Sequence, residues 1–283
     1  MSNLRLGLPS KGRLAEEAEQ LVREAGLNFR RQERSLFAPV GTLPVDVVFL
    51  RTEDIPLLCA EGAIDMGVTG SDLVDEVGVT LNARLALGFG KCRLSVCAPQ
   101  DSIYQTAVDL KGCRLATSFP NVTARFFEQT GTNVHLVPVS GSVEIMIALG
   151  VANAIVDLVQ TGSTLAANHL RMLSDIGHYE SVLVQNPATE QTGTADRVVK
   201  RLEGVVIARS WSLLEYNVPR ERLPEAEAIT PGYNSPTVSA LEDPKWCAVQ
   251  VMVRRDESNE VMDRLERMGA TAILETRIHN CRL

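Results

Sequence analysis

The chain has 283 residues, of which 45% are hydrophobic and 5% aromatic, and its formal net charge is −7. This length allows two or three domains with sizeable cores. The acidic balance and the few aromatic residues argue against a nucleic-acid binder, which needs clustered cations and base-stacking side chains, so we expect no nucleic-acid partner.

Strand and helix signals alternate in the first part of the chain, as is typical of an α/β protein. The predicted elements are a strand at Leu4–Leu8, a helix at Lys11–Ala25, a strand at Val45–Leu50, a short helix from Asp54, a strand at Ile64–Val68 and a helix from Gly70. Ser10 is the predicted N-cap of the first helix, and Gly26 is expected to end it.

The same alternation continues in a second group of elements. Arg93–Ala98 is expected to carry the chain into this group. Predicted strands cover Cys113–Thr117, Val134–Val139 and Ile155–Val159, and predicted helices cover Val122–Gln129, Val143–Leu149 and Ser163–Asn168. A strand at Ser181–Val184 and a helix from about Thr194 to beyond Gly204 follow.

A last segment is expected to begin near Asn217. It contains a predicted strand at Trp246–Val253, an amphipathic helix at Glu257–Met268 and a strand at Thr271–Thr276. Such a strand–helix–strand ending is compatible with a small ferredoxin-like domain.

Six scattered cysteines and four distant histidines lack the spacing of a structural zinc site. We find neither the apolar core of a signal peptide nor an apolar run of membrane-spanning length. We therefore expect a cytoplasmic protein with reduced cysteines and no membrane partner.

A phosphate-binding turn is predicted at the end of the strand Ile155–Val159. Asp157 lies near the end of this apolar run, and Thr161-Gly162-Ser163-Thr164 opens the following helix. Backbone N–H groups, hydroxyls and a helix N-terminus together suit one phosphate, and glycine allows close approach. An upstream carboxylate suits ribose hydroxyls, so the pattern favours a phosphorylated ribose. An ordinary strand–loop–helix turn is the alternative interpretation.

Several motifs, in order along most of the chain, resemble those of the ATP phosphoribosyltransferase family in its long form. They are Leu8-Pro9-Ser10-Lys11-Gly12-Arg13-Leu14, Arg51-Thr52-Glu53-Asp54-Ile55-Pro56, the run from Gly62 to Asp72, Gly88-Phe89-Gly90-Lys91-Cys92-Arg93-Leu94, the run from Glu144 to Leu165, and the run from Pro231 to Ser239. The serine at position 10 lengthens an opening motif that is often Pro-Lys-Gly.

The resemblance implies a two-lobed catalytic core of the type II periplasmic-binding-protein kind, followed by a regulatory domain of ferredoxin-like, or ACT-like, fold. The expected first lobe comprises residues 1–92 and 180–212, and the expected second lobe comprises residues 93–179. The regulatory, histidine-binding domain is then expected at residues 213–283.

The resemblance also implies a reaction. The family transfers the 5-phosphoribosyl group of 5-phosphoribosyl 1-pyrophosphate to N1 of ATP and releases pyrophosphate, as the first step of histidine biosynthesis, under feedback inhibition by histidine. Mg²⁺ is the implied cofactor, bound through the substrate pyrophosphate. A homo-oligomer, from dimer to hexamer, is expected.

Phosphoribosyl pyrophosphate is predicted to bind at Asp157, Val159, Gln160, Thr161, Gly162, Ser163 and Thr164. Asp157, Glu144 and Lys11 are the predicted catalytic residues. Asp157 is expected to hold the ribose hydroxyls, and Glu144 to support this loop or to help bind metal. A capping acid in the first turn of a helix is the alternative for Glu144.

ATP is predicted to bind at Lys11, Arg13, Arg51, Asp72 and Lys91. Two cations at the start of a helix oppose its dipole, and a polyanionic ligand would remove that mismatch for Lys11 and Arg13. A solvated helical turn is the alternative for these two residues, and plain N-capping is the alternative for Asp72. Lys91 and Arg93 lie where the predicted lobes join.

Histidine is predicted to bind in the last domain at Asn217, Ser235, Thr237 and Ala272. A simple proline-induced turn is the alternative for the segment around Pro236. Three other functions are alternatives. One is a type I phosphoribosyltransferase, which normally has two adjacent acids before its phosphate loop, and another is a solute-binding module without catalysis. The third is a catalytically silent regulatory subunit, against which the intact loop argues.

Overall fold

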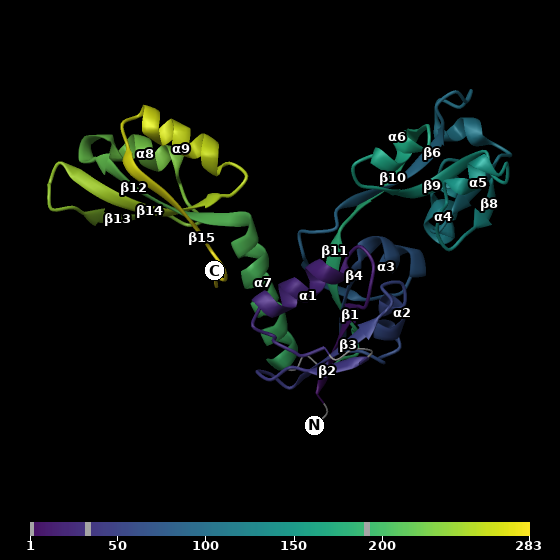
Figure 1. Ribbon diagram of the computed structural model, residues 1–283, viewed down its shortest axis with the longest axis horizontal. Coiled ribbons are helices and arrows are strands. Elements are labelled where there is room, and N and C mark those ends of the chain that lie inside the picture. Colours follow the sequence, from purple (N-terminus) through teal and green to yellow (C-terminus); the bar gives the residue numbers. More distant parts are fainter. Residues whose placement is uncertain (1–2, 32–34, 190–192) are drawn as a thin grey trace. The chain divides into compact units, whose positions relative to one another are not determined.

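The computed structural model describes residues 3–31, 35–189 and 193–283. Of these residues, those up to Gln20 and those of Asn28–Asp196 form one compact unit. Leu21–Leu27 and Arg197–Leu283 form a second unit. The first unit contains two sheets and the second contains one (Figure 1). Each unit has its own buried core.

The first lobe of the first unit is built on a six-stranded sheet of order β2-β3-β1-β4-β11-β5. Its strands are β1 (Leu4–Pro9), β2 (Phe37–Pro39), β3 (Val45–Leu50), β4 (Met66–Gly70), β5 (Asn82–Ala86) and β11 (Ser181–Gln185). β1 pairs in parallel with β3 and β4, whereas β11 runs antiparallel to β4 and β5. The central strands are apolar and nearly fully buried, as expected for strands covered on both faces.

The second lobe is built on a five-stranded sheet of order β10-β6-β9-β7-β8. Its strands are β6 (Cys92–Pro99), β7 (Arg114–Thr117), β8 (His135–Pro138), β9 (Ala154–Val159) and β10 (Leu170–Tyr179). The chain enters this lobe before β6 and leaves it after β10, so the second lobe is an insertion into the first. This confirms the predicted two-lobed α/β arrangement.

Helices connect the strands of both lobes. They are α1 (Ala15–Glu24), α2 (Ile55–Ala60), α3 (Ser71–Val77), α4 (Pro120–Gln129), α5 (Ile145–Ala148) and α6 (Ser163–Ala167), with a 3-10 turn at Ala107–Leu110. Glu76 of α3 links the lobes, because its carboxylate accepts the N–H groups of Asn121 (2.9 Å) and Val122 (3.0 Å) at the start of α4. These bonds satisfy donors that a helix start leaves unpaired.

The first helix begins later than the sequence predicts. α1 starts at Ala15 and not at Lys11, because Gly12 adopts a φ of +89° that breaks the helical path. Ser10 is therefore not its N-cap, and that prediction was wrong. Since Lys11 and Arg13 precede the helix, their charges do not oppose its first turn, which carries Glu16 and Glu17.

The second unit contains a four-stranded antiparallel sheet of order β13-β14-β12-β15. α7 (Gly193–Ser210) leads along the chain to β12 (Trp211–Pro219), α8 (Leu223–Ile229), β13 (Thr237–Ala240), β14 (Trp246–Arg254), α9 (Ser258–Arg267) and β15 (Thr271–Arg277). This β-α-β-β-α-β order is that of a ferredoxin-like domain, which confirms the predicted fold of the last segment.

One face of this sheet is buried beneath α8 and α9 (Figure 1). Side chains on β12 and β14 alternate between buried and accessible positions, as expected when a single face packs against helices. The segment begins earlier than Asn217, since β12 starts at Trp211 and the expected boundary at residue 213 lies within this strand.

Candidate functional site

The predicted phosphate-binding turn connects β9 to α6. Gly162 is the N-cap of α6 and has a φ of +78°, a conformation that other residues rarely adopt. A Cβ atom at this position would meet no atom within 4 Å, so the space beside the glycine is open. The Thr161 and Ser163 hydroxyls lie 3.0 Å apart beside it. The turn therefore presents hydroxyls and the N-terminus of a helix to open space.

Asp157 is partly buried behind this turn. Its Oδ1 accepts the N–H of Leu158 at 2.8 Å. Burial raises the pKa of the Asp157 carboxyl, the Leu158 N–H lowers it, and the charge of Glu144 raises it again. The charge of one carboxylate raises the pKa of another only when the two lie close together, so Glu144 and Asp157 belong to the same site.

Glu144 occupies the N-cap position of α5, but its side chain makes no capping hydrogen bond. The capping interpretation of Glu144 is therefore not supported. Its side chain lines the same cavity as Asp157.

A cavity of about 160 Å³ joins these residues. Its lining residues are Arg13, Glu144, Ile155, Asp157, Leu158, Val159, Gln160, Thr161, Gly162, Ser163, Thr164, Leu165 and Leu170. We call it the phosphoribosyl cavity. It brings together all the residues that the sequence predicts for phosphoribosyl pyrophosphate, and it adds Arg13 from the first lobe, which the sequence assigned to ATP.

Arg13 is held by Asp72 at the start of α3 and by Gly90 in the segment just before β6. Its Nη1 donates to the carbonyl oxygen of Gly90 at 2.7 Å, and its Nη2 lies 3.8 Å from Oδ2 of Asp72. Burial raises the pKa of the Asp72 carboxyl, and the Arg13 charge lowers it. With only 2% of its surface exposed, Asp72 does not reach a ligand directly in this arrangement.

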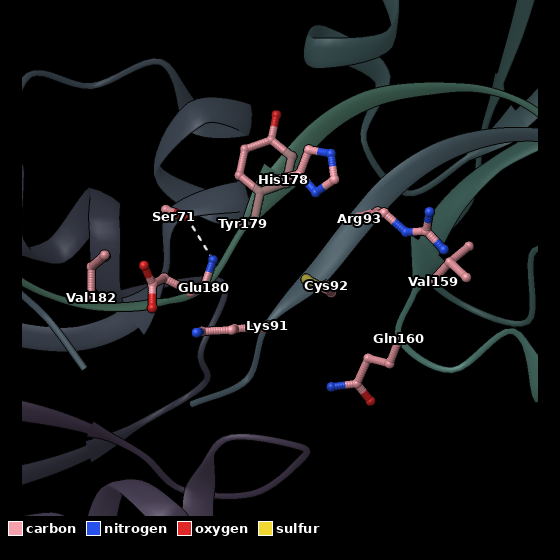
Figure 2. Close-up of a pocket in the computed structure, with 10 residues that line it drawn as sticks. All are labelled: Ser71, Lys91, Cys92, Arg93, Val159, Gln160, His178, Tyr179, Glu180 and Val182. Carbon is pink, nitrogen blue, oxygen red and sulfur yellow. Dashed lines mark hydrogen bonds between the residues drawn. The ribbon is translucent and has the colours of Figure 1, made fainter. Parts of the chain in front are cut away.

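A larger cavity of about 420 Å³ adjoins the first, because Val159 and Gln160 line both. Figure 2 shows Lys91, Cys92 and Arg93 on the segment that enters the second lobe, and His178, Tyr179 and Glu180 on the segment that leaves it. We call it the hinge cavity. Of the residues predicted for ATP, Lys91 alone lines it, and the described lining also holds Arg93 and His178.

Asp175 contacts Arg93 of the hinge cavity, and the sequence did not predict this residue as part of the site. It accepts a hydrogen bond from the Ser95 hydroxyl at 2.6 Å and forms an ion pair with Arg93 at 3.4 Å. Asp157, Ser95 and Asp175 are direct neighbours across β9, β6 and β10. Only the strand register shows this, because these residues are far apart in the sequence.

The remaining predicted cations lie at one edge of the first sheet. Pro9 and Leu50 are neighbours at the ends of β1 and β3, and the exposed residues Lys11 and Arg51 follow them. Neither residue lines the phosphoribosyl cavity or the hinge cavity.

No group of three or more histidine, cysteine, aspartate or glutamate side chains in the described ranges could by itself hold a metal ion. Mg²⁺ commonly needs only one or two carboxylates when substrate phosphates supply other ligands. Glu144 and Asp157 are two such carboxylates in one cavity, so the donor set suits a substrate-bound Mg²⁺. Within the same ranges, no helix is both long and apolar enough to cross a membrane.

The ferredoxin-like domain has a cavity of about 350 Å³ of its own. It is lined by Glu215, Tyr216, Asn217, Thr237, Ser239, Ala248, Val249, Gln250, Ala272 and Leu274. Three of the four residues predicted for histidine lie together here, whereas Ser235 does not line it. Ala272 has a φ of +51°, an uncommon conformation for alanine.

Two family models match the chain. The model described as ATP phosphoribosyltransferase matches residues 51–204, and the model described as HisG, C-terminal domain, matches residues 208–280. An ATP phosphoribosyltransferase of Rhodopirellula baltica is 62% identical over 282 residues, which cover 100% of this chain and 94% of that protein. Its counterpart in Saccharopolyspora erythraea is 40% identical over 281 residues, or 99% of this chain and 100% of that protein.

Solved structures are similar to the chain as well. A structure of the ATP phosphoribosyl transferase (HisG:HisZ) complex from Thermotoga maritima has a TM-score of 0.64 and 29% identity, covering 72% of this chain and 98% of that chain. The substrate-binding protein of an amino acid ABC transporter has a TM-score of 0.50 at 13% identity, covering 73% of this chain and 94% of that chain. This second likeness shows the fold alone.

Proposed function

The chain belongs to the ATP phosphoribosyltransferase family, and from this premise we propose that it joins C1′ of 5-phosphoribosyl 1-pyrophosphate to N1 of ATP. The products are N1-(5-phosphoribosyl)-ATP and pyrophosphate, and the reaction is the first step of histidine biosynthesis. The observation that carries the proposal is the open turn at Gly162 with Asp157 behind it. We assign residues 1–92 and 180–210 to the first catalytic lobe, which thus ends before β12 begins at Trp211, and residues 93–179 to the second.

The phosphoribosyl cavity supports the binding half of the mechanism. The backbone of Gly162, Ser163 and Thr164 and the neighbouring hydroxyls receive the 5-phosphate. The Asp157 carboxylate accepts hydrogen bonds from the ribose hydroxyls and so fixes the orientation of C1′.

The chemical step needs no enzyme nucleophile. The N1 lone pair of adenine forms the new bond to C1′ as the C1′–O bond breaks, and the electron pair of that bond leaves with pyrophosphate. Positive charge develops on the sugar and negative charge on the leaving group, so fixed charges nearby lower the barrier. Asp157 and Glu144 lie on the sugar side, and Arg13 supplies the cation in the same cavity.

The hinge cavity is the proposed site for ATP. It adjoins the phosphoribosyl cavity at Val159 and Gln160, and Lys91 and Arg93 provide cations for the triphosphate. Lys11 and Arg51 are further cations proposed for ATP. Mg²⁺, held by the substrate pyrophosphate with Glu144 and Asp157, would supply further neutralisation of the leaving group.

The proposal is tested by mixing the protein with ATP, phosphoribosyl pyrophosphate and Mg²⁺ and following formation of the nucleotide adduct by ultraviolet absorbance. We expect ATP and the pentose to be consumed in equal amounts. Consumption of a free purine or pyrimidine base with ATP untouched would contradict the proposal and favour a type I phosphoribosyltransferase. Binding without any turnover would favour a solute-binding module.

Histidine is the proposed inhibitor, bound in the cavity of the ferredoxin-like domain. Its amine and imidazole need hydrogen-bond partners, which Asn217 and Thr237 can supply there. We also propose that the protein works in the cytoplasm as a homo-oligomer between dimer and hexamer. The model described as HisG, C-terminal domain, matches residues 208–280, which contain this cavity.

Thr237→Val is expected to raise the histidine concentration for half-inhibition about tenfold, because it removes one hydroxyl partner without changing side-chain volume. The uninhibited rate should not change. Thr276→Val is the matched control, since Thr276 is an exposed threonine of β15 that does not line this cavity. Equal inhibition curves for the parent and Thr237→Val would place the effector elsewhere.

A further inference from the structure

The carboxylate of Asp72 is buried at the start of α3, where Arg13 and the backbone N–H groups of Leu73 and of Asp72 itself lower its pKa against the effect of burial. Its side chain is 3% exposed, and its Oδ1 has no protein hydrogen-bond partner among the described residues. Its Oδ2 has Arg13 at 3.8 Å, which is an ion pair without a short hydrogen bond. Buried charges are normally paired and hydrogen-bonded, so a carboxylate kept in this state needs an explanation.

Two glycines make room for this arrangement. A Cβ on Gly70 would lie 1.9 Å from Oδ1 of Asp72, and a Cβ on Gly90 would lie 2.6 Å from the Ser181 hydroxyl. That hydroxyl is a second buried oxygen without a partner in the described part of the chain. Gly90 and Ser181 lie where the chain passes between the lobes, and Arg13 links the Asp72 carboxylate to this hinge through the Gly90 carbonyl.

Arg13 connects this buried group to the phosphoribosyl cavity. Gly90 and Asp72 engage its two terminal nitrogens, while its side chain stays 32% exposed. A guanidinium carries five N–H donors, so donors remain for a ligand. Arg13 faces Glu144 and Asp157 in that cavity, whose described lining has no other cation.

We propose that Asp72 is a positioning residue that holds Arg13 in place for the diphosphate of the pentose substrate, and that its burial costs stability. The inference rests on the proposed function, because that function supplies a diphosphate at C1′. It replaces the predicted contact of Asp72 with ATP. A fixed cation stabilises a leaving diphosphate without reorganising during the reaction, which a mobile surface arginine cannot do.

The key variant is Asp72→Asn, which keeps the shape and removes the charge. We expect the dissociation constant of pyrophosphate to rise about tenfold, because Arg13 loses its charged partner and is then held only by the Gly90 carbonyl, which leaves its side chain free to move toward solvent. Ribose 5-phosphate, which probes the turn at Gly162, should bind as in the parent. Titration calorimetry with each ligand and Mg²⁺ measures both quantities.

Thermal unfolding distinguishes a positioning role from a structural one, because loss of a structural contact would lower the Tm. We expect the Tm of Asp72→Asn to equal or exceed that of the parent, because the amide removes a poorly satisfied buried charge while Arg13 stays in contact with water. Asp65→Asn is the matched control. Asp65 also forms an ion pair with an arginine, Arg5, but it precedes the first residue of β4, whereas Asp72 follows the last. This control should leave pyrophosphate binding unchanged.

Arg13→Met and the double variant Asp72→Asn/Arg13→Met complete a double-mutant cycle. If Asp72 acts through Arg13, the double variant should bind pyrophosphate no more weakly than Arg13→Met alone. Independent, additive losses would overturn the proposal, and so would tighter pyrophosphate binding by Asp72→Asn, which would show that the carboxylate opposes the anion. A fall in Tm with unchanged ligand binding would assign Asp72 a structural role. Failure of the parent to form the ATP adduct would instead contradict the proposed function.

Discussion

Asp157→Asn is expected to lower turnover at least about a hundredfold, because the reacting sugar loses the group that orients it. The carboxylate lies in the phosphoribosyl cavity beside Glu144 and is linked to the backbone at Leu158. An amide keeps its size but offers a weaker acceptor to the ribose hydroxyls. Initial rates of adduct formation at saturating ATP measure the loss, and Asp101→Asn, an exposed acid of the same lobe, is the control.

The same variant is expected to fold at least as stably as the parent at pH 7. Since burial raises the pKa of Asp157 above its ordinary value of 3.8, the folded state binds this proton more tightly than the unfolded chain does. The free energy of unfolding therefore falls as the pH rises from the ordinary pKa of this carboxyl through its raised pKa. Asparagine does not ionise and avoids this loss.

Calorimetric scans of the parent and of Asp157→Asn test this sign. The difference in Tm should favour the variant at pH 7 and shrink as the pH falls below the raised pKa. A variant with a much lower Tm at pH 7, or with near-normal turnover, would remove Asp157 from the assigned role.

Gly162→Ala is expected to raise the KM for phosphoribosyl pyrophosphate by about a hundredfold. The added methyl group projects into the open space that receives the phosphate, and alanine at a φ of +78° is strained. The strain alone costs about 1 kcal/mol. The KM for ATP should change much less, because the hinge cavity does not include Gly162.

Gly131→Ala separates strain from loss of the phosphate site. Gly131 belongs to the same lobe, has a φ of +64° and also has open space around its missing Cβ. It lies outside both cavities of the first unit described above. We expect this control to lose a similar amount of stability with unchanged kinetics. Equal kinetic defects in both variants would contradict a phosphate site at Gly162.

The buried strands were predictable because their sequences are continuous apolar runs. Val45–Leu50 is predicted and observed with the same bounds, and β9 differs from its prediction by one residue. A strand that is buried on both faces has apolar residues at consecutive positions, so it can be predicted without knowing which strands it pairs with.

The strand β10 (Leu170–Tyr179) was missed for a physical reason. It lies at the edge of its sheet, pairs only with β6 and carries two register irregularities. Its side chains therefore follow neither a continuous apolar run nor a regular alternation. The strand β12 was missed although its burial alternates, because the polar Ser212 occupies a buried position and the apolar Leu213 an accessible one.

The candidate site was predictable where its residues are contiguous. The segment from Asp157 to Thr164 forms one turn, so its spacing in the sequence is its spacing in space. The pairs Arg13–Asp72 and Arg93–Asp175 were not predictable, because each joins segments that meet only after the strands have paired. The assignment of Arg13 to ATP changes for this reason.

A crystal structure with phosphoribosyl pyrophosphate and Mg²⁺ bound would test most directly whether the turn at Gly162 receives the 5-phosphate. The expected result is a phosphate within hydrogen-bonding distance of the N–H groups of Gly162, Ser163 and Thr164, with the ribose hydroxyls on Asp157. An empty turn, with the pentose lodged against Lys91 and Arg93 in the hinge cavity, would contradict the account.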